Sequence, residues 1–199
     1  MTRVFLLRHG HVDNPAQLFY GPDTPLSPRG LRQATALAEK LQAAEVQPSL
    51  IISSPYLRTQ QTTRQIASIF QGVPLLMDDR LVEWQVGDWF GKPLKDFYDY
   101  TKYDQHPAGE LPSNIESLEQ CAARIQAVLM EVVEQNQGKT IFVVSHREPM
   151  ASAILKYEQK GWEAIHALHF PYASAWELPF EGSAQPVSCT KYLDCSRLE

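Results

Sequence analysis

Val4-Phe5-Leu6-Leu7-Arg8-His9-Gly10-His11 is the stretch of sequence around which the rest of the chain is arranged. Its four consecutive apolar residues are typical of a strand buried on both faces, as in a parallel sheet. The strand leads directly into Arg8 and His9, and open α/β sheets bind their ligands at the carboxyl ends of their strands. Gly10 lets the main chain turn sharply and lets a ligand come close to it. A polar surface turn would have the same short sequence, so the interpretation depends on the rest of the chain.

Two further apolar runs also end in polar groups. Residues 50–52 lead into a segment that brings Arg58 into the first turn of a helix, and residues 140–144 lead into His146. Ligand-binding groups of open parallel sheets gather at the carboxyl ends of neighbouring strands. We therefore expect these side chains to lie close to the two that end the first strand. Glu83, which follows another extended segment, is expected at the same edge.

Helical patterns alternate with these strands. Apolar residues recur at helical spacing behind four predicted helix starts, at Ser27–Pro28, Ser54–Pro55, a capping box over residues 113–116, and about Pro149. Residues 173–178 and 187–193 are predicted strands. The sequence allows them to be antiparallel strands at an edge of the sheet. The alternation predicts an α/β fold, a three-layer α/β/α sandwich with a mostly parallel sheet.

Two irregular segments interrupt this alternation. The loop over residues 13–28 is rich in proline and glycine and is longer than a simple connection, which is typical of functional loops. Residues 85–112 lose periodicity and accumulate aromatic side chains, too many for a disordered linker. We interpret residues 85–112 as an ordered insertion, a lid over the carboxyl edge of the sheet, within one domain over residues 1–199.

Composition limits the classes of function. The 199 residues, 44% hydrophobic and 21% charged, are typical of an ordinary soluble protein. A formal net charge of −5 argues against nucleic acid or an anionic membrane as a partner. The sequence shows no signal peptide and no apolar run long enough to span a bilayer. Cys121, Cys189 and Cys195 are odd in number and lack metal-ligand spacing, which predicts a cytoplasmic location without a structural disulfide.

The chemistry of the converging groups points to an anion. Arg8 and Arg58 offer planar donor forks that match phosphate oxygens, and helix amino termini add positive potential. A neutral histidine can attack phosphorus, while a second can donate a hydrogen bond to a phosphate oxygen. The sequence therefore predicts a phosphoryl site.

With these residues in this order, the chain resembles the histidine phosphatase superfamily, in the branch shared with cofactor-dependent phosphoglycerate mutases. The resemblance rests on five motifs in order, which together span most of the chain: LLRHG from residue 6, YGPDTPLSPRGLRQA from residue 20, SSPYLRTQQTT from residue 53, LVEWQVGDWFG from residue 81, and VVSH ending at residue 146. It implies a phosphoglycerate mutase-like fold with a lid insertion.

The resemblance also implies roles. His9 would be the nucleophile that becomes phosphohistidine, and Glu83 the general acid and then the base that activates water. Arg8, Arg58 and His146 would hold the phosphoryl oxygens, with no metal and no cofactor. Around the substrate it implies a further set of residues: Asn14, Tyr20, Gly21 and Arg147.

Three positions depart from the pattern of the similar proteins, and Asn14 matches the usual asparagine only loosely. Val12 stands where a threonine or serine is frequent, Phe90 where an acidic residue is common, and Arg147 where a glycine is usual. None of these departures removes a catalytic group. They all affect the choice of substrate.

Several alternatives remain open from the sequence. The pair His9-Gly10-His11 at a strand end could ligate a metal in a metal-dependent hydrolase, and a non-catalytic phospho-ligand binder would share the anion site. A phosphoglycerate mutase is the closest alternative within the superfamily. We predict a metal-independent phosphomonoesterase that acts on a small phosphate ester and releases phosphate, favouring aryl or bulky esters over bisphosphates. A homodimer is left open.

Overall fold

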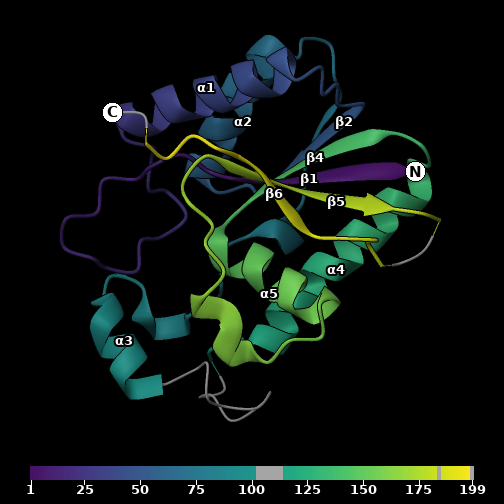
Figure 1. Ribbon diagram of the computed structural model, residues 1–199. Helices are drawn as coiled ribbons and strands as arrows, with labels where there is room; N and C mark the ends of the chain where they lie inside the picture. Colours follow the sequence, from purple (N-terminus) through teal and green to yellow (C-terminus); the bar gives the residue numbers. More distant parts are fainter. Residues whose placement is uncertain (102–113, 183–184, 198–199) are drawn as a thin grey trace.

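A six-stranded sheet lies at the centre of the protein, whose computed structural model describes residues 1–101, 114–182 and 185–197 (Figure 1). The strands, in the order β3-β2-β4-β1-β5-β6, are β3 (Leu75–Met77), β2 (Leu50–Ser53), β4 (Thr140–Ser145), β1 (Thr2–Arg8), β5 (Ser174–Phe180) and β6 (Thr190–Asp194). The first four are parallel, whereas β5 and β6 are antiparallel to their neighbours. The predicted mostly parallel sheet is confirmed, and its two late strands form an antiparallel edge.

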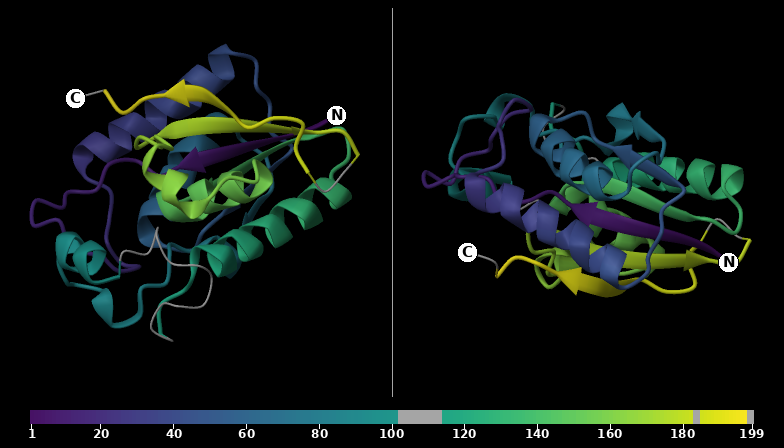
Figure 2. Two further views of the ribbon diagram at one scale, coloured as in Figure 1. Left: turned by 60° about the horizontal axis from the view of Figure 1, so that its bottom comes forward. Right: turned by 90° about the horizontal axis from the view of Figure 1, so that it is seen from above.

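Helices cover both faces of the sheet, as the sequence predicts (Figure 1 and Figure 2). Helices α1 (Pro28–Ala43) and α2 (Leu57–Ile69) pack over one face, and α4 (Leu118–Gln135) and α5 (Arg147–Tyr157) over the other. Along β1, Phe5 and Leu7 face the first pair of helices. Val4 and Leu6 face the second pair, because side chains alternate along a strand. All four are fully buried, which explains why this strand is continuously apolar.

Close packing of two glycines joins the end of β1 to helix α1. Ser27 caps α1 by accepting a hydrogen bond from the backbone nitrogen of Gly30 at 3.0 Å, as predicted. A Cβ atom added to Gly10 would lie 2.3 Å from the carbonyl oxygen of Gly30. Only glycine fits at position 10, so the chain can pass beside the helix immediately after His9.

Three predicted helix starts shift. Helix α2 begins at Leu57 rather than at Ser54–Pro55, because the Ser54 hydroxyl is hydrogen-bonded to His146 instead of capping a helix. The capping box of α4 is formed by Ser117 and Gln120, four residues after the predicted one, whose Ser113 lies outside the described residues. Helix α5 begins at Arg147, two residues before Pro149, so that His146 directly precedes it.

The predicted insertion is ordered where the structure describes it. It contains a short 3-10 turn at Gly87–Trp89 and helix α3 (Leu94–Thr101), which the sequence analysis did not predict. Phe97 is fully buried and packs edge-on against Phe19 at a centroid distance of 4.9 Å. An isolated bridge between Leu18 and Pro93 also joins the 13–28 loop to this segment. Residues 102–112 of the predicted lid lie outside the described residues.

Two other 3-10 turns lie in the part of the chain that the structure describes, at Asp79–Leu81 and Trp162–His166. The first leads directly into the segment that carries Glu83, and the second lies beside α5. Within the described part of the chain, no helix combines the length and the apolar character needed to cross a membrane.

Candidate active site

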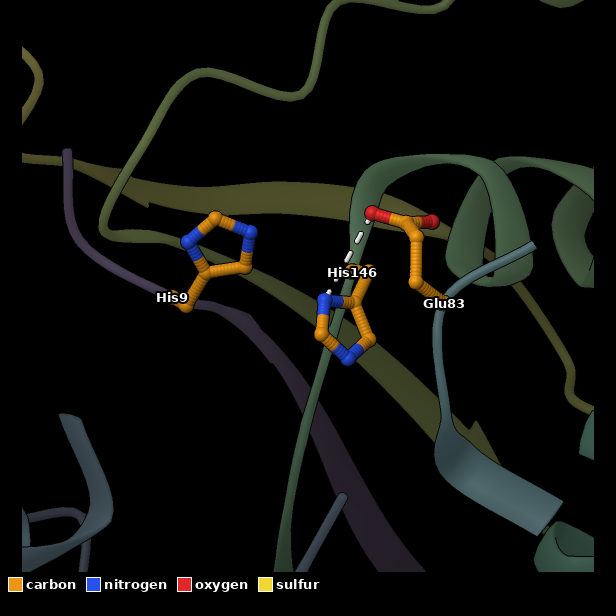
Figure 3. A group of neighbouring side chains, drawn as sticks. All are labelled: His9, Glu83 and His146. Carbon is orange, nitrogen blue, oxygen red and sulfur yellow. Dashed lines mark ion pairs between the residues drawn. The ribbon is translucent and has the colours of Figure 1, made fainter. Parts of the chain in front are cut away.

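Polar side chains converge at the carboxyl ends of three neighbouring strands. His9 follows β1, His146 follows β4, and Arg58 lies in the first turn of α2, just after β2. All three side chains are fully buried, and the two imidazole rings lie 5.2 Å apart between centroids. Glu83 completes the group, with one carboxylate oxygen 3.5 Å from Nδ1 of His146 (Figure 3). The convergence expected from the sequence is therefore present.

Five buried nitrogen atoms in this group have no hydrogen-bond partner among the described residues. They are Nε of Arg8, Nε2 of His9, Nε and Nη2 of Arg58, and Nδ1 of His146. An unpaired buried donor costs roughly 1–3 kcal/mol, and more when it is charged, so native proteins rarely accumulate such atoms in one place. The three arginine nitrogens among them are always donors, and their two positive charges fit a ligand with several anionic oxygens, as a phosphoryl group has.

His9 presents Nε2 as its free nitrogen. Its Nδ1 lies 2.8 Å from the carbonyl oxygen of Gly10, which can only accept, so Nδ1 carries the proton. Burial lowers the pKa of His9 well below its usual range, and the charges of Arg58 and Arg8 lower it further. The ring is therefore neutral at physiological pH. Its Nε2 holds a lone pair and is available as a nucleophile.

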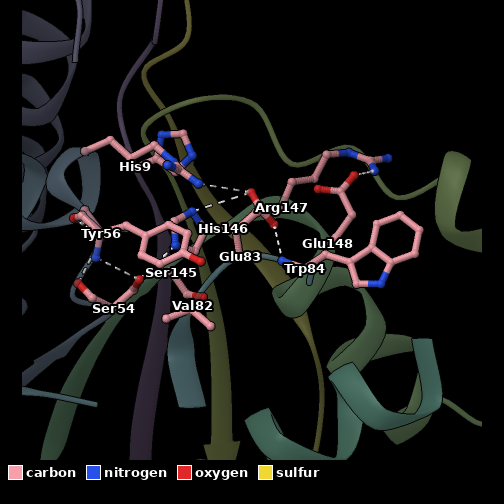
Figure 4. Close-up of polar contacts among 12 residues, drawn as sticks. His9, Ser54, Tyr56, Val82, Glu83, Trp84, Ser145, His146, Arg147 and Glu148 are labelled. Carbon is pink, nitrogen blue, oxygen red and sulfur yellow. Dashed lines mark hydrogen bonds and ion pairs between the residues drawn. The ribbon is translucent and has the colours of Figure 1, made fainter. Parts of the chain in front are cut away.

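Ser54 is the hydrogen-bond partner of His146. The hydroxyl oxygen of Ser54 lies 2.9 Å from Nε2 of His146 and accepts a hydrogen bond from the backbone nitrogen of Tyr56 at 3.4 Å (Figure 4). The hydroxyl can donate its proton to Nε2, and in that tautomer the ring proton lies on Nδ1, facing Glu83. Burial, with Arg58 next, lowers the pKa of His146 well below its usual range, so this ring is a neutral donor. The sequence predicts a helix cap at Ser54, and no local pattern indicates its contact with His146.

Glu83 is held between groups that favour opposite protonation states. Burial raises its pKa to about 7, with the nearby Glu148 as the second cause, while Arg58 opposes the shift. One carboxylate oxygen lies 3.7 Å from Nη2 of Arg58, and the other accepts a hydrogen bond from the backbone nitrogen of Trp84 at 3.0 Å. A carboxyl group with a pKa near neutrality can both donate and accept a proton.

Each arginine is oriented by a backbone carbonyl and an aromatic ring. Arg58 donates from Nη1 to the carbonyl oxygen of Gly21 at 3.0 Å and lies over the rings of Tyr20 and Tyr56. Arg8 donates to the carbonyl oxygen of Phe170 and stacks on Tyr172, with 4.0 Å between its guanidinium carbon and the ring centroid. Nothing in the sequence around Tyr172 indicates this contact.

A cavity of about 490 Å³ adjoins the cluster, and Arg8 and Glu83 form part of its wall. The rest of the wall is mainly apolar and aromatic, with a few polar groups: Leu18, Phe19, Tyr20, Trp84, Phe90, Leu94 and Tyr172, then Asn14, Arg147, Glu148 and His166. Ester-binding pockets have this mixture of apolar walls and few polar groups.

The predicted substrate-binding residues do not all reach this cavity. Tyr20, Asn14 and Arg147 line it, whereas Gly21 is absent from the wall and instead holds Arg58. The side-chain amide of Asn14 is engaged with the backbone of Leu18, through both its oxygen and its nitrogen. Arg147 is paired with Glu148 at 2.6 Å and also donates to a backbone carbonyl of residue 165.

One group of side chains has the composition of a metal site. Ligand atoms of His9, Glu83 and His146 lie within 4.8 Å of one another. However, the guanidinium of Arg58 lies 3.7 Å from the same Glu83 carboxylate and is fully buried there. A fixed buried positive charge repels a divalent cation and attracts an anion. The donor set therefore fits a phosphoryl group better than a metal ion.

Comparison with known proteins places this site in a family. Residues 4–190 match the model of the histidine phosphatase superfamily (branch 1). Phosphoserine phosphatase 1 of Hydrogenobacter thermophilus is 31% identical over 157 residues, covering 75% of this chain and 73% of that protein. A probable phosphoglycerate mutase GpmB of an Enterobacter species is 30% identical, covering 73% and 70%.

A solved structure shows the same fold. YhfR of Bacillus stearothermophilus superimposes with a TM-score of 0.85 at 20% identity, covering 99% of this chain and 100% of that one. Since the family model matches nearly the whole chain, the protein belongs to the histidine phosphatase superfamily, and the phosphatases among its relatives identify it as a phosphomonoester hydrolase.

Proposed function

We propose that this enzyme hydrolyses small phosphate monoesters through a phosphohistidine formed on Nε2 of His9, without a metal ion. The observation that carries the proposal is the convergence of unpaired buried nitrogens around a neutral imidazole whose Nδ1 is already committed to Gly10. This arrangement supplies a nucleophile and the donors that its substrate needs.

In the first step, the lone pair on Nε2 of His9 attacks phosphorus and the bond to the ester oxygen breaks. The protonated carboxyl of Glu83 gives its proton to the departing oxygen, which leaves as an alcohol. Arg8, Arg58 and Nδ1–H of His146 donate hydrogen bonds to the three non-bridging oxygens. Charge that develops in the transition state thus meets donors that are already oriented, which is the main source of such catalysis.

In the second step, Glu83 acts as a carboxylate. It removes a proton from water, whose oxygen attacks phosphorus, and the phosphorus–nitrogen bond breaks with its electrons returning to Nε2. Phosphate leaves, His9 is neutral again, and Glu83 has regained its proton. A pKa of about 7 lets one group perform both transfers near neutral pH.

The cavity supports a preference among leaving groups. Its aromatic wall favours apolar or aryl groups, and the carboxylate of Glu148 disfavours a second anionic group. Phosphoserine, on which a relative is named as acting, is a small ester worth including in any test.

A mutase function has weaker support. Phosphoryl exchange between the hydroxyls of a phosphoglycerate requires cations for the substrate's other anionic group. Among the described residues of the cavity wall, the arginine other than Arg8 is Arg147, and it is paired with Glu148. The structure therefore favours transfer of the phosphoryl group to water.

Trapping the phosphoenzyme tests the proposal. Wild-type protein quenched in base after brief exposure to labelled substrate should retain a label that later incubation in acid removes. His9→Ala should lose both the label and nearly all turnover. His11→Ala is the matched control, because His11 is only half-buried and is hydrogen-bonded to Ser27; it should keep the label. Near wild-type turnover in His9→Ala would refute the mechanism.

The proposal includes two further expectations, one about the cellular location of the enzyme and one about its oligomeric state. A cytoplasmic location rests on Cys121, Cys189 and Cys195, all of which are free thiols. Fractionation of cells that express the protein is the measurement. The homodimer stays a prediction, for which light scattering of the purified protein measures the molar mass.

A further inference from the structure

The segment that carries Glu83 lies outside any helix or strand, yet its backbone is firmly held. It follows the 3-10 turn at Asp79–Leu81 and has no sheet partner. Four successive carbonyl oxygens, those of residues 80 to 83, accept hydrogen bonds from side chains of other elements. Ser145, at the end of β4, donates to the carbonyl of Leu81 at 2.8 Å.

Arg124 of helix α4 holds the other three carbonyls. Its Nη1 donates to the carbonyl oxygens of Arg80 at 2.6 Å and Val82 at 2.7 Å, and its Nη2 to that of Glu83 at 3.2 Å. Arg124 is separated from Glu83 by 41 positions in the sequence. The guanidinium thus ties the segment of the general acid to a helix of the core.

Glu116 braces this guanidinium from the other side. Its two carboxylate oxygens accept from Nε of Arg124 at 2.6 Å and from Nη2 at 2.9 Å, a bidentate pair. Glu116 also exchanges backbone and side-chain hydrogen bonds with Gln85, and its carbonyl accepts from Nε1 of Trp84 at 2.6 Å. Both sides of Glu83 along the chain are therefore fixed by one ion pair.

The arrangement is rigid as well as extensive. The side chains of Arg124 and Glu116 are only 16% and 12% exposed, and the neighbours of Arg124 on α4, Cys121 and Ile125, are buried in the core. A planar guanidinium in a bidentate pair fixes direction as well as charge, which an ammonium cannot do. The backbone of Glu83 is thus held in a fixed position relative to helix α4.

We propose that Arg124, braced by Glu116, is a positioning residue that sets where the Glu83 carboxyl meets the leaving oxygen. The inference rests on the proposed role of Glu83 as general acid. Without the guanidinium, the carbonyls of Arg80 and Val82 lose their partner, that of Glu83 keeps only the side chain of Gln85, and the segment relaxes. A misplacement of about 1 Å at a reacting group can cost on the order of 100-fold in rate. The loss falls on reactions that need the proton from Glu83.

Arg124→Lys is the variant that tests this inference, since it keeps the positive charge but cannot reach three carbonyls and two carboxylate oxygens together. Arg80→Lys is the matched control: it makes the same change in the same segment, but the Arg80 side chain is 42% exposed and binds Asp78 and Glu131. Glu83→Gln is the reference for complete loss of the acid. Rapid-quench measurements give the rate of enzyme phosphorylation with an alkyl phosphate and with an aryl phosphate whose phenol is acidic.

We expect Arg124→Lys to slow phosphorylation by the alkyl ester on the order of 100-fold, and by the aryl ester only a few-fold, since an acidic phenol leaves without a proton. Arg80→Lys should match the wild type with both esters. If Arg124→Lys fails to fold by circular dichroism, Glu116→Gln takes its place in the same measurement. In the lysine variant we also expect the alkaline limb of the kcat/KM profile to move to lower pH, because a Glu83 carboxyl that is displaced towards water has a lower pKa.

Equal losses with both esters, or no loss, in a folded variant would overturn the positioning role. Failure of both variants to fold would mean that the ion pair only supports the structure, which also overturns it. If Glu83→Gln itself slowed both esters equally, the acid assignment would fall first. The proposed function and the positioning role are thus distinguished by two different variants.

Discussion

At the scale of single residues, protonation states decide what each group can do. Glu83 must be protonated for the first step, and burial raises its pKa to about 7. We predict that kcat/KM for an alkyl phosphate falls as the pH rises through about 7. His9 imposes no loss near neutral pH, because burial lowers its pKa and keeps the ring neutral. The measurement is a pH profile of the wild type and Glu83→Gln. A limb that persists unchanged in Glu83→Gln would come from another group, such as the substrate phosphate.

The two site arginines should not tolerate lysine. The unpaired Nε and Nη2 of Arg58 form a planar fork, and the unpaired Nε of Arg8 faces the same cluster. We predict that Arg8→Lys and Arg58→Lys each lose about 2–4 kcal/mol of transition-state stabilisation, the scale of a lost oxyanion donor. The loss is measured both by kcat/KM and by the inhibition constant of vanadate, since vanadate mimics the phosphoryl group. Arg64→Lys, an exposed change on α2, is the control. Unchanged efficiency in either site variant would contradict the assignment.

The residues that sequence reasoning found and missed differ in a physical way. His9 and His146 directly follow apolar strands, so local pattern alone indicates where they lie. Ser54 contacts His146, and Tyr172 contacts Arg8; in both pairs the two residues are distant in sequence. A serine before a proline is equally typical of a helix cap. Only the tertiary structure reveals that its hydroxyl is used elsewhere.

At the scale of elements, the start of α4 shows the limit of local capping signals. Ser113 with Glu116 and Ser117 with Gln120 both fit a capping box, four residues apart. The structure uses the second, because the carboxylate of Glu116 is already held by the guanidinium of Arg124 and by the backbone nitrogen of Gln85. Glu116 and Arg124 together hold the segment of Glu83, which is distant in sequence, so no local pattern could predict this use of Glu116.

The insertion supplies a wall of the cavity, and Phe90 is the part of it that departs from the pattern of similar proteins. We predict that Phe90→Ala lowers kcat/KM for aryl phosphates by about 1–2 kcal/mol, roughly 5- to 30-fold, through lost apolar contact. Inhibition by vanadate should be unchanged in the same variant, because the phosphoryl donors are intact. Equal losses with aryl, phosphoserine and bisphosphoglycerate substrates would show that Phe90 supports the fold and not the leaving group.

At the scale of the whole molecule, the order of strands and helices could be predicted because each parallel strand contains a short apolar run of its own. The convergence of the site followed, since parallel neighbours end at one edge. Helix α3 and the bridge between Leu18 and Pro93 could not be predicted. They depend on burial of Phe97 against Phe19, a contact between two irregular segments far apart in the sequence.

The distribution of charge leads to a prediction about metals. The chain has a net charge of −5, yet its buried site combines two guanidiniums with neutral imidazoles. Such a site favours an anion over a divalent cation. We predict that dialysis against a strong chelator leaves kcat unchanged and that metal analysis finds no stoichiometric ion. Loss of activity in chelator, restored by one divalent metal, would revive the metal-dependent hydrolase and its pair His9 and His11.

The central claim is that Nε2 of His9 is the atom that takes the phosphoryl group. Glu83→Gln should accumulate the intermediate from an aryl phosphate, because the first step proceeds without the acid while attack by water lacks its base. Phosphorus–nitrogen correlations in the NMR spectrum of the ¹⁵N-labelled variant identify the bonded atom. We expect one phosphohistidine, at His9, bonded through Nε2. A phosphoryl group on Nδ1, on His146 or on a residue other than histidine would contradict it.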